Sequence, residues 1–162
     1  MIFIDGDACN VVKITEKIAQ ENSIPCHIYC DVCHELKSTY SEVHIVEKGK
    51  NSADFAIINK CGPNDIVITN DSGLAAMVLA KNGIAINTKG FEYTKRNIMS
   101  YLTSRHIRSD ASRKSSSYHV KGFTHDGHRR RNDYAEILEK AICKTILFHI
   151  GVPTSIRLPS RS

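Results

Sequence analysis

The 162-residue chain carries a net charge of +5, with 41% hydrophobic and 24% charged residues. This is the composition of a soluble globular protein, and the length suits one domain with a substantial core. No apolar run is long enough to cross a bilayer, and the first residues lack the features of a signal peptide, which disfavours membrane and exported proteins. We therefore expect a cytoplasmic protein whose six cysteines are thiols.

Hydrophobic patterning predicts strands that alternate with helices. The strands are expected at 2–4, 24–30, 43–46, 66–69 and 84–86. The helices are expected at 11–20, 53–60, 74–81 and 94–104, capped in the first three cases by Asn10, by Ser52 and by Asp71 or Ser72. This alternation favours right-handed βαβ units, a mainly parallel central sheet and a three-layer α/β/α fold.

The last third of the chain has a different character. Residues 105–124 lack periodicity and are rich in Ser, Arg and Lys, which predicts a long mobile loop. A last helix is expected over 131–148, with an apolar face made of Tyr134, Ile137, Leu138, Ala141 and Ile142. Residues 149–162 are interpreted as a tail. The prediction is one α/β domain over 1–148.

The positive charge is concentrated between Arg105 and Arg131. This segment holds eight cations and two acids, a net charge of +6, so the rest of the chain is close to neutral. Such a segment favours a phosphate-backbone partner, and Tyr118 and Phe123 could stack on unpaired bases. The alternative is a solvated basic loop without a ligand. The nucleic-acid contacts that we select are Arg105, Arg113, Lys114, Lys121, Arg129 and Arg130.

Four aspartates are expected at one edge of the sheet. Asp5 and Asp7 follow the first strand, Asp71 follows the fourth, and Asp54 lies in the first turn of the second helix. Ligands of open parallel sheets bind outside the carboxyl ends of the strands, and clustered carboxylates need a cation between them. Carboxylate oxygens suit Mg²⁺ or Mn²⁺, which could activate water at a phosphodiester. Each acid alone would be an ordinary turn residue or helix cap. The candidates for orienting the ligands are Thr69, Asn70 and Ser72.

These motifs resemble those of the YaiI/YqxD family. Ile4-Asp5-Gly6-Asp7-Ala8-Cys9 is similar to its opening (V/I)-D-(A/G)-D-A-C. Its central and third blocks are matched by residues 53–54, 65–71 and 74–76, and by residues 93–98 with Leu102, Arg105 and Arg113. The resemblance extends over about 1–148. This chain departs from the family at Asn10, where a proline is expected, and at residues 124–131, which are more basic than the acidic helix start usual in the family.

The resemblance implies a PIN-like fold, in which an acidic cluster holds Mg²⁺ or Mn²⁺ in ribonucleases. Asp5, Asp54 and Asp71 match that acidic pattern, and Asp7 is the family's own addition. The implied activity is metal-dependent hydrolysis of RNA, with RNA favoured over DNA as the partner. Family membership alone does not fix activity.

Other interpretations remain open. In a haloacid dehalogenase-like phosphatase, Asp5 would be the nucleophile, Asp7 the general acid/base, and Thr69 would stand at the second motif position. That family then needs a lysine and a late acidic pair near the sheet edge, and no such pair is evident. Cys30-Asp31-Val32-Cys33-His34 matches the c-type haem pattern, which needs an exported chain. A cramped zinc site could use Cys26, Cys30, Cys33 and His34. Cys9 is interpreted as a small packed residue. The non-enzymatic alternative is an RNA-binding module with a structural ion.

Overall fold

The computed structural model describes residues 1–31, 38–47, 49, 51–105 and 130–151, excepting the side chains of Asp7, Cys9, Asp31 and residues 130–132. Its strands are β1 (Ile2–Asp5), β2 (Cys26–Asp31), β3 (Glu42–Val46), β4 (Ile66–Ile68), β5 (Ile84–Asn87) and β6 (Phe91–Tyr93). Its helices are η1 (Gly6–Val11, a 3-10 helix), α1 (Val12–Glu21), α2 (Ser52–Lys60), α3 (Ser72–Ala80), residues 98–105, and α5 (Arg130–His149).

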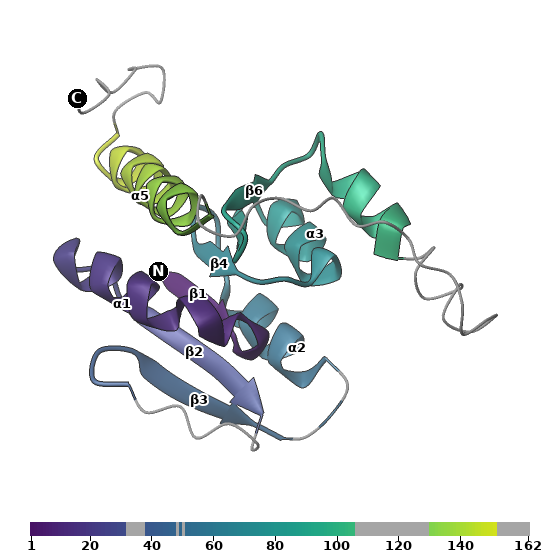
Figure 1. Ribbon diagram of the computed structural model, residues 1–162, viewed down its shortest axis with the longest axis horizontal. Coiled ribbons are helices and arrows are strands. Elements are labelled where there is room, and N and C mark those ends of the chain that lie inside the picture. Colours follow the sequence, from purple (N-terminus) through teal and green to yellow (C-terminus); the bar gives the residue numbers. More distant parts are fainter. Residues whose placement is uncertain (32–37, 48, 50, 106–129, 152–162) are drawn as a thin grey trace.

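The strands form one sheet in the order β3-β2-β1-β4-β5-β6. All neighbours pair in parallel except β5 and β6, which are antiparallel. Helices α1 and α5 pack on one face, and α2 and α3 pack on the other (Figure 1). The predicted three-layer α/β/α fold with a mainly parallel sheet is confirmed.

Alternate residues of the central strands supply two separate cores. Ile2 and Ile4 of β1 pack against α1 and α5, whereas Phe3 packs on the α2 and α3 side. Ile66, Val67 and Ile68 of β4 divide in the same way. A strand that is covered on both faces needs apolar side chains at every position, which explains its uninterrupted apolar run.

Two predicted helix caps are wrong. Because the chain turns from β1 directly into η1, Asn10 lies inside a helical turn, and the residue before α1 is Val11, which makes no side-chain capping bond. Ser52 is the first residue of α2 instead of its cap, and Asn51 precedes it in a left-handed conformation (φ +63°). The third prediction is confirmed, since Asp71 caps α3.

The region after β5 also differs from the prediction. Residues 91–93 form β6, which is too short to give a periodic signal, and the turn that leads to it contains Gly90 at φ +79°. The next helix spans 98–105 instead of starting at residue 94. Residues 94–97 form a turn in which the Thr94 amide donates to Asn97 Oδ1 (2.8 Å) and the Asn97 amide donates to Thr94 Oγ1 (3.3 Å).

The predicted last helix is confirmed as α5. Its buried side chains are Tyr134, Leu138, Ala141 and Ile142, and the partly buried Ile137 packs beside them. The predicted loop after residue 105 and the tail beyond residue 151 lie outside the described residues. In the part of the chain that the structure describes, no helix is long and apolar enough to span a membrane.

Candidate acidic metal centre

The strand order gives the sheet a switch point between β1 and β4. From β1 the chain proceeds to β2 and β3 on one side, whereas β4, β5 and β6 extend on the other side. The order of the strands therefore reverses between β1 and β4. In open α/β sheets, ligands bind outside the carboxyl ends of the strands at such a switch point. The residues at this point are Asp5, which ends β1, and Thr69, Asn70 and Asp71, which follow β4.

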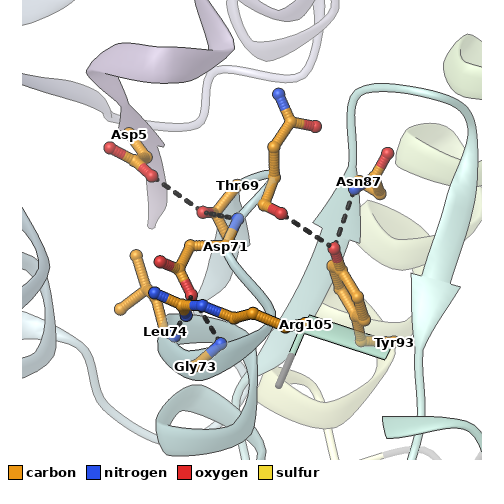
Figure 2. Close-up of polar contacts among 9 residues, drawn as sticks. Asp5, Thr69, Asp71, Gly73, Leu74, Asn87, Tyr93 and Arg105 are labelled. Carbon is orange, nitrogen blue, oxygen red and sulfur yellow. Dashed lines mark hydrogen bonds and ion pairs between the residues drawn. The ribbon is translucent and has the colours of Figure 1, made fainter. Parts of the chain in front are cut away.

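Thr69 connects the two strand ends through its hydroxyl group. The hydroxyl donates to Asp5 Oδ2 (2.8 Å) and accepts from the Asp71 amide (2.9 Å), as Figure 2 shows. Thr69 is fully buried and Asp5 is only 5% exposed. One carboxylate oxygen of Asp5 is thus held by a fixed donor, which restricts the rotation of a side chain at the cavity wall.

Asp71 combines the roles of helix cap and ion-pair partner. Its Oδ1 accepts from the amides of Gly73 (2.6 Å) and Leu74 (3.3 Å) in the first turn of α3. The Arg105 guanidinium also donates to Oδ1 (Figure 2). A Cβ at Gly73 would lie 2.8 Å from Nη1 of Arg105, so a glycine leaves room for this pair. These three contacts all use Oδ1, and none of them occupies Oδ2.

A second polar network supports the loop that carries Asp71. Asn87 Nδ2 donates to the Tyr93 hydroxyl (2.8 Å), which donates to the carbonyl of Asn70 (3.4 Å). Thr88 Oγ1 donates to Asn70 Oδ1 (2.8 Å). The Tyr93 hydroxyl is protonated at neutral pH and can donate, and burial raises its pKa further above the usual value. The residues after β4 are therefore held from the β5–β6 side as well as from β1.

Three of the four predicted acids line one cavity of about 190 Å³. Asp5 reaches it from the end of β1, Asp54 from the first turn of α2, and Asp71 from the loop before α3. The fourth, Asp7, lies in η1, and its side chain is outside the described residues. Ser72, a predicted orienting residue, is buried at the start of α3.

Glu47 is a lining residue that the sequence analysis missed. It directly follows β3 and lines the same cavity. The sequence does indicate this position, because an acid just beyond a parallel strand lies at the same edge of the sheet as Asp5. Tyr29 and Cys30 of β2 also line the cavity, but buried strand residues of this kind carry no sequence signal that separates them from the core.

The donor set fits a hard divalent cation. Four carboxylates and no imidazole line the cavity among the described residues, and oxygen ligands of this kind suit Mg²⁺ or Mn²⁺. The three aspartates do not form a group with ligand atoms within 4.8 Å of one another among the described side chains. This spacing is compatible with Mg²⁺, which usually keeps several waters and binds protein through only one or two carboxylates.

Most of the predicted nucleic-acid contacts lie outside the part of the chain that the structure describes. Arg113, Lys114, Lys121 and Arg129, and the side chain of Arg130, lie outside the described residues. Arg105 is described, 55% exposed, and paired with Asp71. Two residues of the cramped zinc site, Cys33 and His34, also lie outside the described residues, and the other two, Cys26 and Cys30, are buried.

Comparisons with known proteins identify relatives of this chain. The model of the family described as "Uncharacterized BCR, YaiI/YqxD family" matches residues 3–144. A UPF0178 protein of Clostridium acetobutylicum is 47% identical over 75% of this chain and 82% of its own length. UPF0178 proteins of Clostridium novyi and Clostridium tetani are 42% and 38% identical, over 86% and 93% of this chain and 95% and 96% of their own lengths. No solved structure matches the chain.

Proposed function

This chain belongs to the YaiI/YqxD family, and we propose that it is a metal-dependent nuclease that hydrolyses RNA phosphodiester bonds. The observation that carries the proposal is the collection of Asp5, Asp54 and Asp71 in one cavity at the switch point of the sheet. The three acids come from three different elements that are far apart in sequence. Such convergence is more than the local demands of turns and caps require.

In this proposal, one or two of Asp5, Asp54 and Asp71 contact the ion directly, and the remaining carboxylates of the cavity, with Glu47 among them, hold it through bound water. Asp7 is kept as a further candidate carboxylate. When bound, Mg²⁺ or Mn²⁺ would neutralise charge on the phosphodiester and lower the pKa of a water. Thr69 fixes the orientation of Asp5. The proposal is thus supported by carboxylates that line one cavity and by a buried hydroxyl that orients one of them.

Arg105 provides a candidate phosphate contact beside this cavity. Its guanidinium pairs with Asp71 and is half exposed. Five donors in a planar fork allow one side of the group to contact a phosphate while another side keeps its carboxylate partner. The distribution of charge along the sequence supports the same partner, because Arg105 begins the segment that holds the excess of cations.

The phosphatase alternative receives no support from Thr69. In that mechanism, a hydroxyl at this position would face the phosphoryl group. The Thr69 hydroxyl is instead buried between Asp5 and the Asp71 amide. We retain the PIN-like nuclease assignment as the proposal, with a three-layer fold that is compatible with it.

The test is cleavage of end-labelled single-stranded and hairpin RNAs in Mn²⁺ by the wild type and by Asp54→Asn. The matched control is Asp133→Asn, which also removes an acid from a helix's first turn, but in α5 and away from the cavity. We expect cleavage by the wild type and the control, and none by Asp54→Asn. RNA binding that survives in chelator, without cleavage of any substrate, would contradict the proposal and favour a binding module.

A further inference from the structure

Two imidazoles and a carboxylate gather on a different part of the sheet. His27 of β2 and Glu42 of β3 are paired in the parallel register, and His44 lies two residues beyond Glu42 on the same face of β3. Among the described residues, these three form the only group of three or more His, Cys, Asp or Glu side chains whose ligand atoms all lie within 4.8 Å of one another. None of them lines the acidic cavity.

The distances between the ligand atoms of this group are close to those between two ligands of the same metal ion. Nδ1 of His27 lies 3.1 Å from Nε2 of His44, and Glu42 Oε2 lies 3.3 Å from Nδ1 of His27. Glu42 Oε1 lies 3.8 Å from Nε2 of His44. Two ligands that bind Zn²⁺ tetrahedrally at about 2.0–2.1 Å are separated by roughly 3.3 Å. Only small side-chain shifts would therefore be needed for all three to contact one ion.

The rings are held in place before any ion arrives. His27 stacks on Phe3, with ring centroids 5.6 Å apart, and His44 stacks on Tyr29, with centroids 4.5 Å apart and planes inclined by 16°. The His27 and His44 side chains are 20% and 30% exposed, whereas Glu42 is 67% exposed. The two nitrogens are consequently fixed by packing, and the site stays open to solvent on the side of the carboxylate.

We propose that His27, His44 and Glu42 bind a borderline divalent transition metal, of which Zn²⁺ is the representative. Two imidazole nitrogens and one carboxylate oxygen are a donor set that Zn²⁺ accepts, and three protein ligands leave a position for water or another ligand. A neutral imidazole offers the lone pair that such an ion needs, and each of the two histidines has one ring nitrogen turned toward the other ligand atoms of the group. The site differs from the acidic cavity in its ligands and in the class of ion that it selects.

The test is calorimetric titration of the full chain with Zn²⁺ at pH 7, in an excess of Mg²⁺ that occupies the acidic rim. We expect His44→Gln and Glu42→Gln each to lower the Zn²⁺ affinity at least about tenfold, since loss of an outer-shell partner alone costs that much in known sites. His149→Gln is the matched control, because His149 is exposed on α5 and its Nδ1 contacts only the Thr145 carbonyl in the described structure (2.7 Å). It should leave the affinity unchanged.

Glu42 is exposed, so Glu42→Gln should keep the fold even if a histidine variant does not. Far-UV circular dichroism of each variant would verify that it is folded. Substitution of Co²⁺ for Zn²⁺ identifies the donors. We expect visible bands typical of nitrogen and oxygen ligands, without the near-ultraviolet charge-transfer band of thiolate ligands. An affinity within twofold of the wild type in both variants, or a thiolate band at full occupancy, would overturn the assignment.

Discussion

At the scale of single residues, one hydroxyl group connects Asp5 with Asp71, two acids of the cavity. Thr69 donates to Asp5 and accepts from the backbone of Asp71, and it is fully buried. A valine would fit the same volume but could make neither bond. The contribution of Thr69 is therefore separable from its packing, which makes it a suitable position for a test.

We expect Thr69→Val to lower the free energy of unfolding by about 1–3 kcal/mol, because a buried carboxylate and an amide each lose a partner. Urea denaturation measures this change. Thr103→Val is the control, since Thr103 is exposed and its hydroxyl contacts only the helical carbonyl of Met99 in the described structure (2.9 Å). It should change stability by less than about 0.5 kcal/mol. Equal effects of the two variants would contradict the account of Thr69.

The buried thiol of Cys26 predicts a loss of stability in alkali. Burial raises its pKa from 9.0 to about 11. The unfolded chain therefore loses this proton first, so the stabilisation is complete below pH 9 and is lost as the pH rises toward 11. We expect the free energy of unfolding to fall across this interval, and Cys26→Ala to reduce the fall by about 1–3 kcal/mol. Urea midpoints of both proteins provide the measurement, and parallel pH profiles would contradict it.

At the scale of elements, the position of η1 depends on a close approach of two backbones. A Cβ at Gly6 would lie 3.0 Å from the Tyr29 carbonyl oxygen and 3.1 Å from Cα of Cys30. Both obstacles belong to the backbone of β2, which cannot rotate away as a side chain can. Gly6 therefore allows the chain to turn into η1 immediately after Asp5.

We expect Gly6→Ala to destabilise the fold by about 1–3 kcal/mol, as overpacking does elsewhere. It should also lower the affinity for Mn²⁺, because Gly6 directly follows Asp5, and a shift of the backbone at Gly6 would move the Asp5 carboxylate in the acidic cavity. The control is Gly62→Ala, whose Cβ would meet only Asp65 Oδ2 at an ordinary 3.5 Å. Thermal denaturation and calorimetry measure the two effects, and a Gly6→Ala protein as stable as this control would show that the contact with β2 is not tight.

The sequence predicted the existence of strands and helices better than the residues at which they begin and end. Apolar runs and helical spacing are strong where a strand or helix is buried, and β1, β4 and α5 are found where they were expected. Caps depend on the backbone angles of one residue, so Asn10 and Ser52 were misassigned although their chemistry is suitable for capping. The three residues of β6 are too few to show a period at all.

At the scale of the whole molecule, the candidate site depends on the order of the strands. Alternation of strands and helices predicts parallel pairing, but it does not say which strands are neighbours. The adjacency of β1 and β4 is what brings Asp5 within hydrogen-bonding distance of Thr69, 64 residues away. The contact between Arg105 and Asp71 likewise arises from packing between distant segments, and no spacing in the sequence announces it.

The central claim is that the carboxylates of the acidic cavity bind a hard divalent cation. Calorimetric titration with Mn²⁺ of the wild type and of Asp71→Asn tests it most directly. An asparagine can still cap α3 through its side-chain oxygen, so the variant changes the charge of the rim while it keeps the helix start. The loss of the exposed pair with Arg105 should cost less than about 1 kcal/mol of stability.

We expect Mn²⁺ to bind the wild type and Asp133→Asn, and the affinity of Asp71→Asn to be at least about tenfold lower with its helix content unchanged. That result would establish the acidic rim as a metal site and justify a search for nucleic-acid substrates. An equal Mn²⁺ affinity in Asp71→Asn, or no binding by the wild type, would contradict the account and leave the aspartates as helix caps and turn residues.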